Sequence, residues 1–322
     1  LVTIFLLSIF SFNSCFVTTM AVDKVSQSLS GRDKKGATLK KKKDIPPENQ
    51  AMYVITSESD ITLIEDFFPS ALVMYEIVLS QNPDHLGLKG MTGSLHIMYA
   101  NAFIQSPADL LGIEDFDLHN NEYKRAEYHY LKGRDMCISV LDSKHPGFKK
   151  LISTGDEKYI KDACAMLTRD DVETAYWAGS GWLGAFALNP INPNILGNLS
   201  APVAILERCS KLDPDYSKGA VWEVLARFYA SAPSDFGGDK DHALLCISEA
   251  MRCSGGNTPG PYIIMAECFC IPKGEQKAFT DYLNKALDVN PDLNPESRLA
   301  TTIAQKKAKH LLDNKNNFFI EW

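Results

Sequence analysis

The segment Asp213-Pro214-Asp215 places two carboxylates on either side of a proline, just before an aromatic stretch that contains Trp222. A pair of carboxylates with separated pKa values is suited to general acid–base catalysis. The same pattern recurs at Asn82-Pro83-Asp84 and Asn290-Pro291-Asp292, each time after an apolar helix end. A proline cannot continue a helix, and it biases the preceding residue away from the helical region. The aspartates are therefore predicted to be turn and cap residues and not an acid–base pair.

The three corner prolines also mark an internal repeat. Counting back five, eight and twelve residues from each gives Val78, Tyr75 and Ala71; Cys209, Leu206 and Pro202; and Ala286, Leu283 and Phe279. A degenerate fourth copy contains Ala243, Ile247 and Ala250 and ends at Gly255. This is the spacing of the second helix of a tetratricopeptide-type repeat, where small residues let the paired helix approach closely.

The elements that carry these corners are predicted to be helices. From residue 60 onward the apolar residues follow helical spacing almost throughout, without a long alternating strand pattern. Helices are predicted over about 121–143, 156–167 and 170–188, and 295–312 is predicted to be a capping helix. The fold class is therefore all-α: an α-solenoid of about four degenerate tetratricopeptide-like helix-turn-helix repeats with extra helices, over residues 51–322.

Motifs of known enzymes and metal sites are missing from the sequence. It has no nucleophile elbow, phosphate loop, HExxH or Gly-rich dinucleotide turn. FGGDKDHA lacks the GK[ST] ending of a phosphate loop, and Asp239 or Asp241 is predicted to be the N-cap of the next helix. His96 is predicted to be a packed or rim histidine. We expect a non-enzymatic protein with no catalytic residues, no cofactor and no metal.

Composition narrows the class further. The 322 residues carry a net charge of −7, which argues against a nucleic-acid binder, and 45% of them are hydrophobic, enough for a large core. The eight cysteines lack zinc-site spacing. Most of them are predicted to act as small hydrophobes in helices, and one disulfide is left open.

Aromatic residues concentrate on the predicted first helices of the units. In such solenoids these helices line the concave face, where ligands bind. The predicted ligand- or partner-binding residues are Tyr176, Trp177, Trp182, Trp222, Arg227, Phe228, Tyr229 and Tyr262. The alternative is that most of these aromatic side chains fill the core between helices. Small residues around Trp177 would permit close approach of a neighbouring helix or a ligand.

The N-terminus is predicted to be a targeting segment. LVTIFLLSIFSF is apolar and uncharged, too short to span a bilayer but suited to a signal peptide. The FNSC that follows resembles a bacterial lipobox, so residues 1–15 are predicted to be signal peptide and lipobox, with Cys15 lipidated. An ordinary signal peptide with an incidental cysteine is the alternative. Residues 16–50, rich in Lys and Ser, are predicted to be a flexible tether because they bury little apolar surface.

Together, the lipobox, the linker, the cryptic repeats and two longer segments resemble one family. The segments are ETAYWAGSGWLGAFAL and LERCSKLDPDYSKGAVWEVLARFYASAPSDFGGDKDHA. The family is the TRAP-transporter-associated TPR lipoprotein, the T component of a tripartite ATP-independent periplasmic transporter. The resemblance covers about residues 60–312. It implies a periplasmic protein, lipid-anchored to a bacterial membrane, that forms a homotrimer and partners the transporter's solute-binding protein. It also implies pores or clefts that pass a ligand, with a hydrophobic organic acid as one candidate.

Two functions therefore stay open at this point. The first is a transport accessory that binds a solute-binding protein and a small ligand. The second is a TPR-type assembly or scaffold lipoprotein whose groove takes peptide segments in the periplasm.

Overall fold

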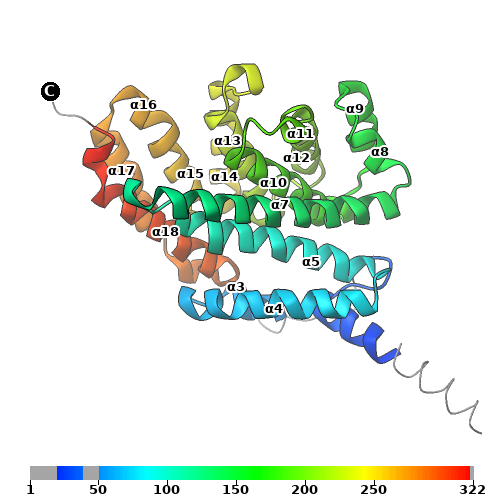
Figure 1. Cartoon of the computed structure of the whole chain (residues 1–322). Coiled ribbons are helices and arrows are strands. Elements are labelled where there is room, and N and C mark those ends of the chain that lie inside the picture. The colour runs from blue at the N-terminus through cyan, green and yellow to red at the C-terminus, as the bar shows by residue number, and fades with distance from the viewer. Residues whose placement is uncertain (1–19, 39–50, 320–322) are drawn as a thin grey trace, which may run out of the picture.

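The computed structural model describes residues 20–38 and 51–319, and their regular structure is helical (Figure 1). The predicted all-α class is confirmed. Within those two ranges the only β-type pairing is an isolated bridge between Arg32 and Thr38. The predicted signal peptide and lipobox, with Cys15, lie outside the described residues. None of the described helices combines the length and the apolar character needed to cross a membrane.

The helices follow one another with short connections. The first part of the chain contains a helix over 20–30, α3 (Ala51–Thr56), α4 (Ile61–Gln81), α5 (Leu86–Tyr99), the π-helical turn η2 (Ala100–Gln105), α6 (Ser106–Ala108), α7 (Phe116–Lys144), α8 (Phe148–Ile152) and α9 (Glu157–Met166). The second part contains α10 (Val172–Leu188), α11 (Pro193–Leu196), α12 (Ser200–Leu212), α13 (Ala220–Ser231), α14 (Lys240–Ser254), α15 (Gly260–Ile264), the π-helical turn η7 (Met265–Cys270), α16 (Ile271–Lys273), α17 (Gln276–Leu287) and α18 (Arg298–Asp313).

The four helices expected from the sequence are present as α7, α9, α10 and α18. α7 begins at Phe116, earlier than expected, because no glycine or proline interrupts residues 113–132. Asp239 is the N-cap of α14: its carboxylate accepts hydrogen bonds from the backbone of Asp241 and His242, at 3.0 and 2.9 Å. Of the two N-cap candidates, Asp239 is therefore the correct one.

The Pro-Asp corners close helices as predicted. α4 ends at Gln81 before Pro83, and α12 ends at Leu212 before Pro214. Asp213 pairs with Arg169 and Asp215 with Arg252, each at 3.2 Å, so both carboxylates brace the corner. The repeat positions are largely core: those buried include Ala71, Tyr75, Leu206, Cys209, Ala243, Ile247, Ala250, Phe279, Leu283 and Ala286. The grouping of the helices into about four tetratricopeptide-like repeats stays a prediction.

Close helix packing organises the middle of the molecule. α7 packs against both α5 and α10, and α10 in turn packs against α12. Gly93 and Gly133 face each other across the α5–α7 contact, where a Cβ on Gly133 would lie 2.5 Å from the Gly93 carbonyl oxygen. Gly181 likewise lies against Ile97 and the backbone of α7. These glycines let the helix axes approach closely, because any larger side chain would hold them apart.

The C-terminal helix returns to the first helices of the described domain. α18 contacts α3 and α4, and Figure 1 shows α18 and α3 side by side. Arg298 Nη1 donates a hydrogen bond to the Ser57 carbonyl at 2.7 Å, just after α3. Elements from opposite ends of the chain are thereby held together.

Residues 20–38 differ from the predicted flexible tether. The helix over 20–30 buries Ser26 and Ser30, and Tyr75 of α4 donates a hydrogen bond to the Leu29 carbonyl at 3.1 Å. Arg32 forms an ion pair with Glu173 of α10. The amino-acid composition did not indicate this ordered helix, because the segment is held mainly by hydrogen bonds and one ion pair. Such contacts do not require a high content of apolar residues. Residues 39–50 of the predicted tether lie outside the described residues.

Candidate functional site

A chain of polar side chains connects five separate elements, and we call it the polar network. Arg227 of α13 donates to Glu267 of η7, and Lys307 Nζ of α18 lies 3.0 Å from Glu267 Oε1. Lys307 also lies 3.7 Å from Asp109 Oδ2, in the turn after α6. Tyr123 of α7 donates its hydroxyl to Asp109 Oδ1 at 2.7 Å. The network thus joins α6, α7, α13, η7 and α18 through side chains.

The polar network contains two cations and two carboxylates, and burial shifts the pKa values of some of its groups. Burial alone would raise the pKa of Glu267, but Arg227 and Lys307 together hold it below its usual range. Burial, and then the Asp109 carboxylate, raise the pKa of Tyr123 far above its usual value. The side chain of Arg227 is 39% exposed and that of Lys307 is 27% exposed, so both side chains reach the surface in part.

Both described π-helical turns lie in or beside this network. η7 supplies Glu267. η2 supplies Gln105, whose Oε1 accepts the Tyr130 hydroxyl at 2.6 Å, and Asn101, whose amide donates to the same hydroxyl at 3.0 Å. Tyr130 of α7 is buried, and its burial raises the pKa of its phenol. Single π-helical turns inside α-helices are rare and recur at functional sites.

Four of the predicted site residues besides Arg227 are partly buried. Tyr176 and Trp177 of α10 meet edge-on with ring centroids 5.1 Å apart. Trp222 donates its indole N–H to the Pro214 carbonyl at 2.9 Å, so it braces the preceding corner. Tyr262 donates to the Gly256 carbonyl at 3.1 Å. The structure places these side chains on α10, α13 and α15, but it does not bring them into one cluster.

Three predicted site residues lie in the core. Trp182, Phe228 and Tyr229 are only 5%, 6% and 8% exposed. The guanidinium of Arg134 lies 4.9 Å from the Trp182 ring centroid, and Tyr229 donates its hydroxyl to Glu207 at 2.8 Å. For these three, the structure favours the core alternative.

The small residues of α10 serve helix packing. A Cβ on Gly179 would lie 2.7 Å from Leu206 of α12, and one on Gly184 would lie 2.5 Å from the ring of Tyr130. The approach that these glycines permit is therefore to neighbouring helices.

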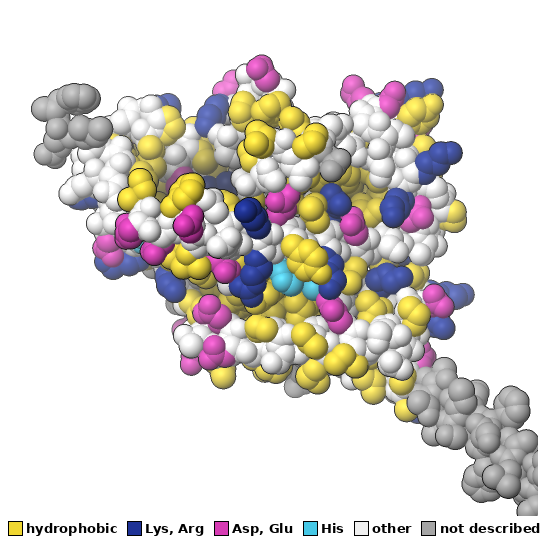
Figure 2. Space-filling model, viewed as in Figure 1, with side chains coloured by type: hydrophobic (Ala, Val, Ile, Leu, Met, Phe, Trp, Pro, Cys, Tyr) yellow, Lys and Arg dark blue, Asp and Glu magenta, His cyan; other side chains and the backbone are white. Residues whose placement is uncertain are grey.

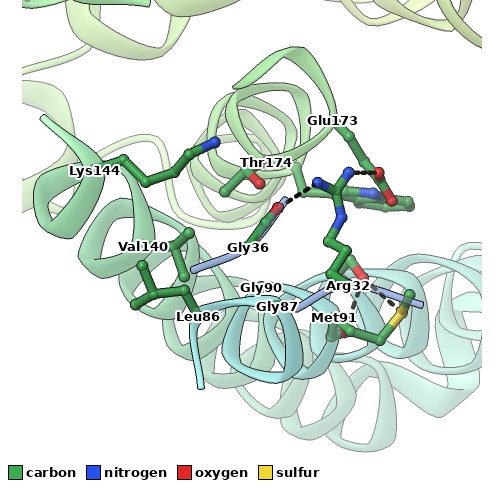
Figure 3. Close-up of a pocket in the computed structure, with 12 residues that line it drawn as sticks. Arg32, Gly36, Leu86, Gly87, Gly90, Met91, Val140, Lys144, Glu173 and Thr174 are labelled. Atoms are coloured by element: carbon green, nitrogen blue, oxygen red, sulfur yellow. Dashed lines mark hydrogen bonds and ion pairs between the residues drawn. The ribbon is translucent and has the colours of Figure 1, made fainter. Parts of the chain in front are cut away.

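A small cavity adjoins Trp177 where the N-terminal segment meets the helices. Figure 3 shows the Arg32 guanidinium directed toward Glu173, with a second hydrogen bond to the Gly36 carbonyl. Gly90, Lys144 and Thr174 also line the cavity, whose volume is about 20 Å³. That is room for about one water molecule. The residues of this chain already fill the space around it.

Asp109, Tyr123, Glu267 and Lys307 are absent from the sequence-based site list. They sit far apart in the sequence and outside any motif, so only the tertiary fold brings them together. Arg227 is the one network residue that the sequence singled out, because it lies in the aromatic helix after the Asp213 corner. A single charged residue in an otherwise apolar helical segment, such as Glu267 in MAECFC, is the signal that could have pointed to a buried ion pair.

Residues 20–38 and 51–319 contain no group of three or more His, Cys, Asp or Glu side chains arranged to hold a metal ion. The seven cysteines in these ranges are free thiols, and most of them are buried.

Packed helices, with a polar network linking several of them, define an all-α protein. The family model described as the TRAP transporter T-component matches residues 57–319. The chain belongs to this family, which confirms the resemblance and supports an accessory role in a TRAP transporter. It is also 38% identical over 268 residues to an uncharacterized protein of Treponema pallidum (strain Nichols), covering 83% of each chain.

Proposed function

We propose that this protein is a non-enzymatic, lipid-anchored periplasmic accessory of a TRAP-type transporter. In this proposal it binds the transporter's solute-binding protein, handles a hydrophobic organic acid and acts as a homotrimer of tetratricopeptide-like solenoids. Family membership supports the transporter role. The polar network supports the ligand class, because Arg227 and Lys307 are cations on partly exposed side chains that are already paired with carboxylates.

The ligand's carboxylate would replace Glu267 or Asp109 as the partner of Arg227 and Lys307. A guanidinium binds a carboxylate with two parallel hydrogen bonds, which fixes orientation as well as affinity. In this proposal the predicted aromatic residues of α10, α13 and α15 support the helices that carry the site, because the structure does not gather them into one wall beside Arg227.

The test is native mass spectrometry of the purified chain with a panel of aliphatic and aromatic carboxylic acids. Arg227→Gln is expected to lower acid binding at least about tenfold, since it removes a charge-assisted pair. Arg252→Gln is the matched control, because Arg252 forms exposed ion pairs with Asp215 and Glu249 elsewhere. Equal binding by wild type and Arg227→Gln would refute this ligand site.

The partner is tested separately by affinity capture from the periplasm. Copurification of a solute-binding protein supports the transporter role. Recovery of outer-membrane assembly factors alone would favour the scaffold function instead.

A further inference from the structure

α4 carries an exposed apolar face in addition to the face that it buries. Ile64, Phe68, Leu72 and Tyr75 point into the core, whereas five apolar side chains on the other side are roughly half exposed or more: Leu63, Phe67, Val73, Met74 and Ile77. At 100° per residue these five fall within a sector of about 120°, so they form one stripe, which we call the α4 apolar face. Figure 2 shows hydrophobic side chains along the lower edge of the molecule, over α4.

The α4 apolar face carries little charge. Asp66 is the one ionisable side chain among the exposed residues of α4, and the helix contains no Lys or Arg. A contiguous apolar stripe of this kind on a soluble domain marks an interaction surface, since isolated exposed apolar residues are scattered.

The helix over residues 20–30 lies beside the C-terminal end of α4. Asn82, at the C-terminal end of α4, donates its amide to Asp23 and to Ser26, each at 3.3 Å. Met20 and Val25 on this helix are 46% and 47% exposed. Figure 1 shows the N-terminal helix in dark blue beside that end of α4. Lys24, Lys34 and Lys35 are exposed on the same segment, which gives its edge a basic character.

The loop that follows fixes this helix in place. Leu86 N donates to the Lys34 carbonyl at 2.9 Å, and Arg32 pairs with Glu173 of α10. A Cβ on Gly87 would lie 2.5 Å from the Arg32 Cβ, so α5 has room for the loop only because residue 87 is a glycine. The position of residue 20 relative to α4 is therefore set by specific contacts.

The chain leads from residue 20 back to Cys15 in five residue steps. Even fully extended, these steps span no more than about 18 Å. If Cys15 carries the lipid, as in the proposed function, the anchor holds residue 20 within that distance of the bilayer, and the end of α4 lies beside the same helix, at Asp23 and Ser26. The lysines near this point belong to the N-terminal segment, whereas α4 itself contains three acidic residues and no basic one, so the contact of α4 with lipid would be apolar and not electrostatic.

We propose that the α4 apolar face rests on the surface of the lipid bilayer. The inference rests on the lipid anchor of the proposed function and goes beyond it by giving the domain a fixed orientation. The network of Arg227 and Glu267 would keep a constant direction relative to the membrane, whereas on a flexible tether the domain would tumble.

The experiment uses the full chain with a bimane fluorophore on Met74→Cys, and with the same label on Leu245→Cys of α14 as the matched control. Leu245 is 65% exposed, close to the 62% of Met74. The unsubstituted chain, labelled in parallel, corrects for its own thiols. Two kinds of vesicle are added: one of phosphatidylcholine alone, and one in which about one third of the lipid is the anionic phosphatidylglycerol. The expected result is a blue shift of the label at 74 with either kind of vesicle, because the contact is apolar, and no shift at 245.

A second variant tests the energetic contribution without relying on a label. The double substitution Phe67→Glu/Met74→Glu is expected to lower vesicle partitioning at least about tenfold, because charged side chains at these positions oppose insertion. Leu244→Glu/Leu245→Glu on α14 should leave partitioning unchanged. Circular dichroism of both variants checks that they fold.

Two outcomes would overturn the inference. Vesicle binding without a spectral shift at 74 would mean that the anchor alone holds the protein. A blue shift without vesicles that grows with protein concentration would mean that a second copy of the chain covers this face. Capture of the solute-binding protein by the same variants is scored separately, so the transporter role can stand while the lipid contact fails, and the reverse.

Discussion

His96 and His129 face each other across the α5–α7 contact with their Nδ1 atoms 2.9 Å apart and their rings stacked. His96 is 1% exposed, and its Nε2 lies 2.7 Å from Glu76 Oε1, which also accepts from Lys132. A hydrogen bond between two Nδ1 atoms requires that at least one ring be neutral. At least one ring of the pair is therefore neutral in the folded protein.

The histidine pair predicts acid sensitivity. Burial lowers the pKa of His96 to about 4, and burial together with His96 and Arg125 lowers that of His129 to about 4. Unfolded histidines take up protons near pH 6.5, so the unfolded state binds more protons between pH 6.5 and 4. Stability should be level above about pH 6.5 and fall progressively toward pH 4, where the slope from the pair ends.

Urea unfolding at pH 7, 6 and 5 measures this slope. His129→Phe should reduce the loss between pH 7 and 5, because one proton-binding site of the unfolded chain is gone. Asn121→Ala, at an exposed and uncharged position on the same helix, is the control and should leave the slope as in the wild type. If the pH dependence of the unfolding free energy is the same in His129→Phe as in the wild type, the histidine pair is not its cause.

Asp171 predicts a second, larger effect on stability. It is 1% exposed, it accepts from His145 at 2.8 Å and from the Thr168 backbone and hydroxyl, and it pairs with Lys144. Burial would raise its pKa, but these donors lower it to about 2. Asp171→Ala leaves the donors unpaired and should cost about 2–4 kcal/mol at pH 7, measured by urea unfolding.

The neighbouring Asp170→Ala is the control for that measurement, since Asp170 is exposed. Its effect should stay within about 0.5 kcal/mol. Because the folded pKa of Asp171 is depressed, its contribution is present above about pH 4 and is lost as the pH falls toward 2. Equal stability of the two variants at pH 7 would contradict the view that Asp171, in the turn before α10, stabilises the protein by binding Lys144 and His145 at the end of α7.

The glycine contact between α5 and α7 predicts opposite signs for two alanine substitutions. In Gly133→Ala the new Cβ would lie 2.5 Å from the Gly93 carbonyl oxygen, so backbone has to move, at a cost of about 1–3 kcal/mol. In Gly90→Ala the nearest atoms are 3.9 Å away, and the better helix propensity should stabilise by up to about 1 kcal/mol. Thermal unfolding of both variants measures the two changes in stability. Destabilisation of similar size in both would show that the close contact between α5 and α7 is not the cause of the effect at Gly133.

The sequence predicts elements better than it predicts sites, and particular residues show why. The Pro-Asp corners and the buried positions Leu206 and Leu283 follow from local chemistry and helical spacing, which any stretch of sequence displays. Asp109 and Lys307 meet only because α18 folds back onto earlier helices, and no local pattern encodes that contact. Residues 20–38 show the same limit, because their position depends on contacts with Glu173 and Gly87. Those two residues are distant in the sequence, and the composition of the segment itself carries no information about them.

The two tryptophans of α10 offer a final prediction that separates core from surface roles. Trp182 is 5% exposed and packs in the main core, whereas Trp177 is partly buried, touches Tyr176 and borders the small cavity beside Arg32. Removing a large buried aromatic side chain typically costs about 3–5 kcal/mol, and the cost falls when part of the ring already faces solvent. Trp182→Ala should therefore destabilise the protein by about 3–5 kcal/mol and Trp177→Ala by clearly less.

Trp177→Ala should keep its helical circular dichroism signal while weakening ligand or partner binding. If Trp177→Ala instead unfolds as readily as Trp182→Ala, both tryptophans are core residues, and the binding surface must be sought at Arg227 and the polar network alone.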